Sequence, residues 1–95
     1  MKRYIVAVSG LTDIEETEFI EFARANELKW WHYIGNFWLL IDPNENLDAA
    51  RIRDKLHAMK SSMRCIVIEN PDNETWAGFG PKEKHIFDWV KKNLD

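Results

Sequence analysis

The aromatic segment 29–42, KWWHYIGNFWLLID, limits the possible folds more than any other part of the chain. It holds three of the five tryptophans, and the Gly-Asn pair at 35–36 is typical of a two-residue hairpin turn, because both residues tolerate positive φ. With such a turn, Tyr33 lies opposite Trp38, and strand alternation places Trp31 on the same face. The segment therefore predicts a β-hairpin that is apolar on both faces. One face is expected to pack on helices, and the other to meet a second sheet, a partner subunit or a ligand.

The order of the remaining segments predicts the fold class. Apolar, β-rich runs at 3–8 and 63–69 predict strands, and helices are expected after Thr12 and after Asn46. Together with the hairpin, the order is β-α-β-β-α-β, which is that of the ferredoxin-like fold. This fold has an antiparallel sheet with two helices on one face. We therefore expect residues 1–95 to form a single α+β domain.

Each of the two expected helices has a cap and an apolar stripe. Thr12 and Glu15 have the spacing of a capping box, and Asn46 is the expected cap of the second helix. The side chains expected to face inward are Ile14, Phe19, Phe22 and Ala23 in the first helix, and Ala49, Ile52, Leu56 and Met59 in the second.

The ferredoxin-like core is expected at 1–70, followed by an extension at 71–95 with a short extra strand and a helix that begins at Pro81. Two interpretations of the extra strand stay open. Trp76, Gly78 and Phe79 form either an edge strand that pairs with a second subunit or a loop packed by its aromatic side chains.

Composition bounds the possible functions. The net charge of −3 weakly disfavours a nucleic-acid binder, but residues 1–27 are acidic whereas residues 46–64 carry five basic and two acidic side chains. No apolar run reaches the roughly 18 residues of a membrane span, and no signal-peptide pattern opens the chain. The single Cys65 lies in an apolar run. We therefore expect a cytoplasmic protein without a membrane contact.

Five short motifs resemble a known family. They are WWHY at 30–33, FWLL at 37–40, IRDKL at 52–56, IVI at 66–68 and WAGF at 76–79. These motifs resemble those of the small bacterial SinR-family proteins, whose fold is similar to the ferredoxin-like nuclease subunit that partners the CRISPR integrase. The resemblance covers the chain from Met1 to about Phe79. It implies a homodimer and a connection to mobile elements, phage defence or counter-defence.

One departure from that pattern bears on catalysis. The nuclease-like proteins carry a metal-binding Asp near the end of the first strand, where this chain reads VSGL at 8–11. A hard divalent cation needs carboxylates at the reacting centre. We therefore favour a protein that is not an enzyme and has no metal or cofactor. The rival interpretation is a metal-dependent nuclease whose site is rebuilt from Asp13 and Asp42 or Asp72.

The favoured function is a non-catalytic protein that binds a nucleotide or a nucleic acid. Trp31, Tyr33 and Trp38 are predicted to stack on bases. Arg3, Arg64 and the basic second helix are predicted to contact phosphates. The competing explanations for the aromatic face are a dimer interface and coverage by the third helix.

Ser9 and His32 are the remaining candidate ligand residues. Ser9 precedes a helix whose backbone N–H groups attract anions, although the acidic first turns of that helix oppose this. His32 lies in the aromatic hairpin, and it is either a packed structural residue or a contact to a ligand.

The remaining alternative function is a protein–protein inhibitor module that presents the acidic first helix, including Glu15 and Glu18, to a basic partner.

Overall fold

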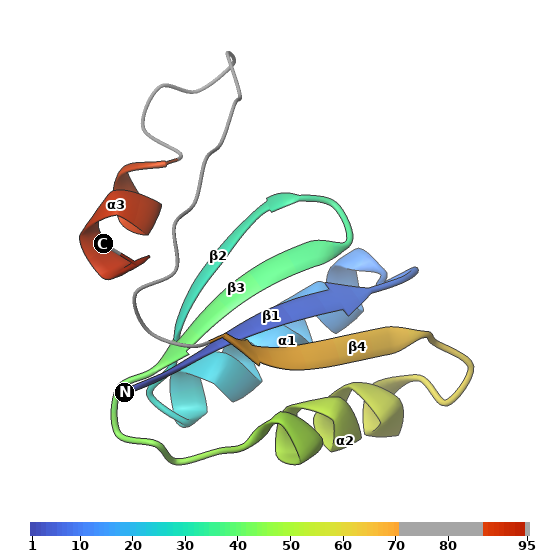
Figure 1. Cartoon of the computed structure of the whole chain (residues 1–95). Coiled ribbons are helices and arrows are strands. Elements are labelled where there is room, and N and C mark those ends of the chain that lie inside the picture. The colour runs from blue at the N-terminus through green and yellow to red at the C-terminus, as the bar shows by residue number, and fades with distance from the viewer. Residues whose placement is uncertain (71–86, 95) are drawn as a thin grey trace.

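The computed structural model describes residues 1–70 and 87–94. In these residues the chain forms four strands and three helices, drawn in Figure 1: β1 (Lys2–Val8), α1 (Asp13–Ala25), β2 (Lys29–Ile34), β3 (Phe37–Asp42), α2 (Ala49–Met59), β4 (Cys65–Asn70) and α3 (Asp88–Leu94). The strands form one antiparallel sheet in the order β2-β3-β1-β4. The protein is thus α+β. No helix in the described part is long and apolar enough to cross a membrane.

Several predictions for the extension lie outside the described residues. These are the strand at 76–79 with Trp76, Gly78 and Phe79, and the helix start at Pro81. The part of the C-terminal helix that is described begins at Asp88. Its Val90 is buried.

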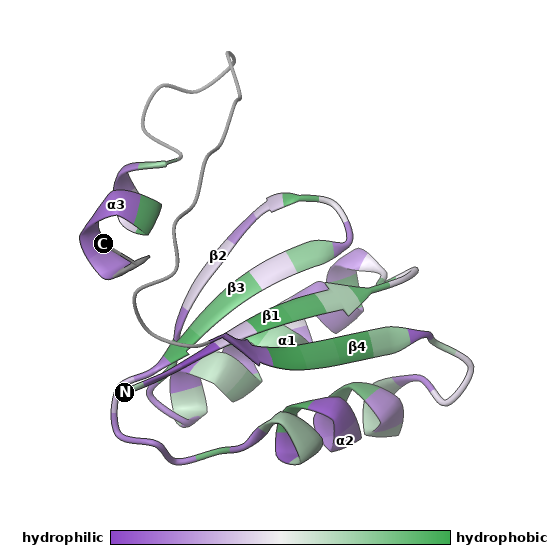
Figure 2. Ribbon diagram, viewed as in Figure 1, coloured by the Kyte–Doolittle hydropathy of each residue, from purple (hydrophilic) through white to green (hydrophobic). Residues whose placement is uncertain are grey.

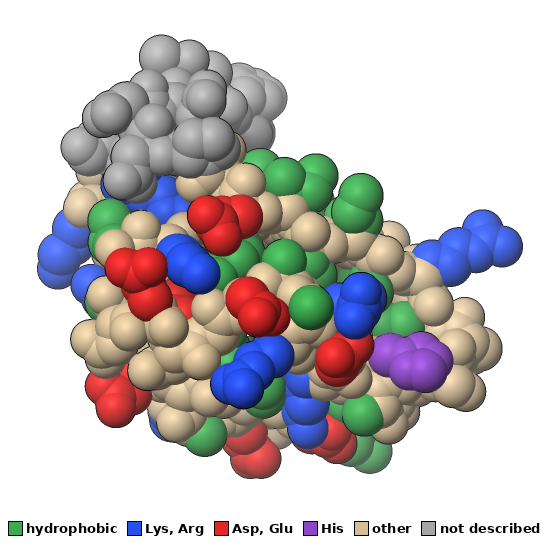
Figure 3. Space-filling view, turned by 60° about the horizontal axis from the view of Figure 1, so that its bottom comes forward, with side chains coloured by type: hydrophobic (Ala, Val, Ile, Leu, Met, Phe, Trp, Pro, Cys, Tyr) green, Lys and Arg blue, Asp and Glu red, His purple; other side chains and the backbone are tan. Residues whose placement is uncertain are grey.

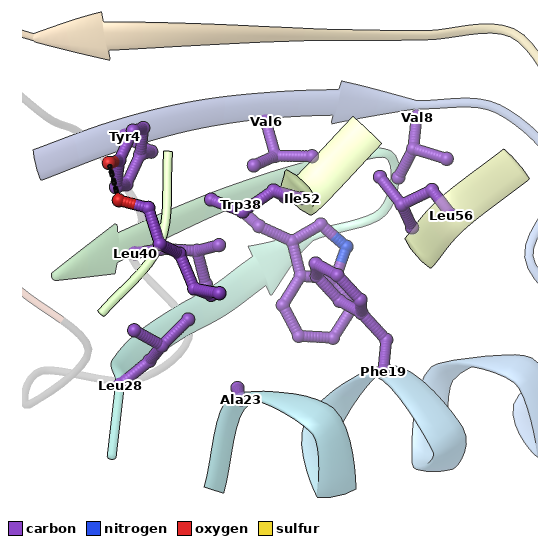
Figure 4. Close-up of a cluster of buried hydrophobic side chains, with 11 residues drawn as sticks. Tyr4, Val6, Val8, Phe19, Ala23, Leu28, Trp38, Leu40, Ile52 and Leu56 are labelled. Atoms are coloured by element: carbon purple, nitrogen blue, oxygen red, sulfur yellow. Dashed lines mark hydrogen bonds between the residues drawn. The ribbon is translucent and has the colours of Figure 1, made fainter. Parts of the chain in front are cut away.

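The hydrophobic core lies between one face of the sheet and the two longer helices (Figures 1 and 4). Alternate residues of β1 and β3 point into it and meet the stripes predicted for α1 and α2. Phe19, Ile52 and Leu56 are fully buried, which confirms the centre of both stripes. The main core residues are Tyr4, Val6, Val8, Phe19, Ala23, Leu28, Trp38, Leu40, Ile52 and Leu56.

The capping box of α1 is present, but one inward prediction is wrong. The backbone N–H of Glu15 donates to Thr12 Oγ1 at 3.2 Å, and the backbone N–H of Thr12 donates to Glu15 Oε1 at 2.9 Å. Ile14, however, is 82% exposed. It precedes Phe19 by five residues, which at 3.6 residues per turn places the two side chains about 140° apart around the helix.

The cap of α2 is Asp48 rather than the predicted Asn46. Asp48 Oδ1 accepts a hydrogen bond from the backbone N–H of Arg51 at 2.8 Å. Asn46 belongs to the preceding turn, because the buried carboxylate of Asp42 accepts from the backbone N–H groups of Asn46 (3.0 Å) and Leu47 (2.7 Å). The helix begins only after this turn.

The hairpin forms with its turn at 35–36, but its register differs from the prediction. Ile34 pairs with Phe37 beside the turn, whereas Trp31 pairs with Leu39. Between these two pairs, two residues of β2 therefore lie opposite one residue of β3. This β-bulge reverses the faces of the residues that follow it. Trp31 and Trp38 therefore lie on opposite faces of the sheet, and the predicted shared face is wrong.

The second sheet face has no helix across β1 and β4 among the described residues. Figure 2 shows this face toward the viewer, with hydrophobic residues along both strands. Ile66 and Ile68 of β4 are 58% and 48% exposed there. α3 lies beside β2, at the other edge of the sheet (Figure 1).

Candidate functional site

Trp38, predicted to stack on a base, is fully buried among core side chains. The rings of Trp38 and Phe19 are nearly perpendicular with centroids 5.0 Å apart, and the His32 ring stacks on one face of Trp38 with centroids 3.7 Å apart. A stacked base would need an open face of this ring, and the full burial of Trp38 leaves none. Trp38 is a core residue in this structure.

His32 connects the hairpin to α1. Its Nδ1 lies 2.9 Å from the carbonyl oxygen of Phe37, and its Nε2 lies 3.2 Å from Glu16 Oε1. The ring also stacks on Trp38. Since both ring nitrogens and one ring face are engaged within the protein, the geometry assigns His32 a structural contact rather than a ligand contact.

Trp31 and Tyr33 lie on the other sheet face, and of these two side chains Tyr33 is exposed whereas Trp31 is buried. Trp31 stacks on Phe87 with centroids 5.8 Å apart and planes 25° apart, and its ring is nearly perpendicular to that of Phe37, with centroids 6.3 Å apart. The residue that precedes α3 thus covers Trp31. Of the three predicted stacking residues, Tyr33 alone is open to a ligand, so the predicted platform does not assemble.

The predicted phosphate contacts are also dispersed. In the pairing of β1 with β4, Arg3 lies opposite Asn70 at one end, while Arg64 precedes the pair of Val8 and Cys65 at the other. Five residues of strand separate these ends by about 17 Å. The basic residues of α2 lie on the helix side, where Figure 3 shows acidic and basic side chains intermixed.

Ser9 lies next to Arg64, but its polar groups are already bonded. Its backbone N–H donates to the carbonyl oxygen of Arg64 at 2.9 Å, and its hydroxyl lies 3.3 Å from the backbone nitrogen of Arg64. At the start of α1, the capping box satisfies the N–H of Glu15 and brings a carboxylate to the helix end. This arrangement disfavours phosphate binding there.

The carboxylates of the two alternative functions, a metal-dependent nuclease and an acidic inhibitor module, lie far apart or contact other protein groups. Asp42 pairs across from Lys2 at one end of β1, whereas Asp13 follows the other end. Asp72 lies outside the described residues. Among residues 1–70 and 87–94, no three His, Cys, Asp or Glu side chains are grouped as a metal ion requires. On α1, Glu18 pairs with Lys55 of α2 at 3.0 Å.

A different group of residues forms a hollow where β2 begins. Leu28, Lys29, Trp30 and Trp89 line this hollow, which we call the edge groove. Its volume of about 280 Å³ lies near the lower limit of small-molecule sites, roughly 300 Å³, and suits one ring system. Trp30 comes from β2 and Trp89 from α3, so packing of the C-terminal helix beside the sheet edge creates the groove.

Two cationic side chains, Arg24 and Lys29, lie at the edge groove. The guanidinium carbon of Arg24 lies 5.6 Å from the centroid of the Trp30 ring, and Lys29 Nζ lies 3.4 Å from Asn93 Oδ1. Segments 24–29 and 88–93 together carry four basic and two acidic side chains, although the whole chain carries a net charge of −3. The groove thus combines aromatic walls with locally positive charge.

Sequence reasoning missed the edge groove because its walls are 59 positions apart in the chain, at Trp30 and Trp89. A local signal exists in both segments. Each of these tryptophans is flanked within three residues by lysine, in KWW at 29–31 and DWVKK at 88–92. Only the packing of α3 against β2 joins the two signals.

Comparison with protein-family models, curated proteins and solved structures finds no match to this chain. The resemblance to the SinR family stays a prediction.

Proposed function

We propose that the protein is a non-catalytic module that binds a nucleotide, free or at an exposed position of a single strand, in the edge groove. The observation that carries this proposal is that Trp30 and Trp89 line one hollow together, next to the cations of Lys29 and Arg24. An indole stacks on any nucleobase, at roughly 1–3 kcal/mol per base. Lysine and arginine supply charge-assisted hydrogen bonds to phosphate.

The proposed site lies at one edge of the antiparallel sheet, where β2 begins. We propose that the arrangement is ferredoxin-like, which is supported by the element order and by antiparallel neighbours in the order β2-β3-β1-β4. The SinR-like motifs suggest a role in phage defence or counter-defence. Because a fold alone does not define an activity, the proposal depends on the edge groove.

Titration with mononucleotides and short single-stranded oligonucleotides, followed by tryptophan fluorescence, tests the proposal. We expect saturable quenching that weakens as salt is added, since phosphate contacts release counterions. Trp89→Leu is expected to weaken binding roughly 5- to 150-fold, the equivalent of one stacked base. Lys29→Gln is expected to reduce both the affinity and the salt dependence.

Tyr33→Leu is the matched control, because it removes an exposed aromatic side chain that does not line the edge groove. It is expected to leave the affinity unchanged. Absence of any response from the folded wild-type protein, or equal losses in Tyr33→Leu and Trp89→Leu, would overturn the proposal. Binding by oligonucleotides alone would identify a nucleic acid rather than a free nucleotide as the ligand.

A further inference from the structure

The helix α3 packs beside the sheet outside the main hydrophobic core (Figure 1). Val90 of α3 is buried, at 3% exposure, but it does not belong to the cluster that joins the sheet to α1 and α2. Phe87, which precedes the helix, stacks on Trp31 of β2, and Trp31 also lies outside that cluster. The described apolar contacts of α3 are therefore separate from the main core.

This arrangement allows α3 to leave the sheet while the rest of the fold stays intact. Isolated helices shorter than roughly 12–15 residues are marginal in water, and the described helix has seven residues. Its helical structure therefore depends on packing against the sheet edge. Segments that bury few apolar side chains open at a lower free energy than the core does. Local opening of α3 is thus favoured over opening of the main core.

The edge groove is complete only when α3 is docked. Trp89, one of its two aromatic walls, comes from α3. Asn93 of α3 holds the cation of the groove: Lys29 Nζ donates to Asn93 Oδ1 at 3.4 Å, and Asn93 Nδ2 donates to the carbonyl oxygen of Trp89 at 2.8 Å. Undocking therefore removes one wall and also the α3 partner of Lys29. The docked and undocked forms present different sites to a ligand.

Charge opposes docking until an anion is present. Segments 24–29 and 88–93 each carry two basic side chains and one acidic side chain, which gives each a net charge of +1. Docking brings these two positive segments together, and like charges repel, modestly where water and salt screen them. A phosphate beside Lys29 offsets this repulsion. An anionic ligand therefore favours the docked form more than an uncharged one does.

We propose that α3 is a ligand-coupled clamp, which docks and undocks at the β2 edge and is held in the docked position by a nucleotide in the edge groove. This inference rests on the proposed function and adds the motion that regulates the same site. A ligand shifts an equilibrium by its difference in affinity for the two states, and the docked form offers the second aromatic wall and the positioned lysine. The coupling is reciprocal, so contacts that hold α3 also strengthen binding.

Amide hydrogen exchange of the whole chain, followed by NMR, tests the clamp. The backbone N–H of Lys91 donates to the carbonyl oxygen of Phe87 at 3.0 Å, so its exchange reports the opening of α3. Without ligand, we expect this N–H to exchange faster than those in the ladder between β1 and β3. The probe is adenosine 5′-monophosphate, or a short oligoadenylate where only a strand binds. At about 30 times Kd, exchange at Lys91 is expected to slow roughly 30-fold.

Two matched substitutions separate clamping from general stability. Val90→Ala and Val6→Ala remove the same two methyl groups from buried side chains, and neither residue lines the edge groove. Val90→Ala is expected to speed exchange at Lys91 roughly 10-fold and to weaken nucleotide binding as the docked fraction falls. Val6→Ala, in the main core, is expected to lower Tm but to leave exchange at Lys91 and nucleotide affinity unchanged.

The failure of the clamp and the failure of the proposed function give different results. Nucleotide binding without any change in exchange at Lys91 would overturn the clamp alone. The same conclusion would follow if Lys91 exchanged as slowly as the β1–β3 ladder without ligand, or if the two valine variants had equal effects on its exchange. Absence of nucleotide binding by the folded wild-type protein would instead overturn the proposed function, and the clamp with it.

Discussion

The imidazole of His32 lies parallel to the indole of Trp38, with ring centroids 3.7 Å apart and an angle of 2° between the planes. The β2 bulge makes this contact possible, because it places His32 on the helix side of the sheet. From there, the ring also reaches Glu16 on α1. One side chain thus joins the hairpin, the core and the first helix.

Replacing His32 tests this connection. His32→Ala removes the ring stack and both hydrogen bonds, so we expect a loss of about 1–3 kcal/mol in the free energy of unfolding. His32→Phe keeps a ring on Trp38 but neither bond, and it is expected to fall between Ala and wild type. Chemical denaturation followed by circular dichroism measures both. Equal stability of His32→Ala and wild type would contradict the assigned role.

Because Trp38 is buried and Ile14 is exposed, truncation to alanine is expected to lower the free energy of unfolding strongly at Trp38 and very little at Ile14. Trp38→Ala leaves a large cavity between the sheet and Phe19, and we expect a loss of about 3–5 kcal/mol. Ile14→Ala changes an exposed position on α1, and its effect is expected to stay within about 0.5 kcal/mol. Thermal unfolding of the two variants distinguishes this structure from one in which Ile14 faces the core.

The capping box makes stability depend on acid pH. The hydrogen bond from the backbone N–H of Thr12 lowers the pKa of Glu15 below its ordinary value. Since the folded-state pKa is the lower one, this contribution is present above the ordinary pKa and is lost as the pH falls through the lowered value. The stability difference between wild type and Glu15→Gln is therefore expected to shrink below about pH 4. A pH-independent difference would contradict this.

Tyr4 is expected to affect stability at alkaline pH. Its buried hydroxyl donates to the carbonyl oxygen of Leu47 at 3.1 Å. Burial, together with nearby carboxylates, raises its pKa to about 12. In the unfolded chain this hydroxyl loses its proton near pH 10. The stabilisation is therefore complete below about pH 10 and is lost as the pH rises to about 12. The free energy of unfolding is expected to fall by on the order of 2 kcal/mol over this interval. Unfolding of Tyr4→Phe is expected to depend less on pH over this interval.

Most of the fold follows from local patterns. Thr12 and Glu15 mark the first helix, the pair at 35–36 marks the hairpin turn, and Ile52 and Leu56 mark the buried side of the second helix. These features depend on residues a few positions apart. For the same reason, the α+β class and the order of the elements in 1–70 could be predicted from the sequence.

The candidate site could not be predicted, because it depends on a bulge and on a long-range contact. One extra residue in β2 separates Trp31 from Trp38, and simple alternation does not reveal such an insertion. The edge groove exists only where α3 brings Trp89 to Trp30. Neither tryptophan was among the predicted ligand residues, although lysines near both provided a signal.

The most direct test of nucleotide binding in the edge groove is the response of the individual tryptophan side chains. Two-dimensional NMR of uniformly ¹⁵N-labelled protein resolves the indole N–H groups, which single Trp→Phe variants assign. On titration with a mononucleotide, or with a short single strand, we predict that the signals of Trp30 and Trp89 move together while that of buried Trp38 stays in place. Saturable binding that leaves Trp30 and Trp89 unchanged would contradict the account.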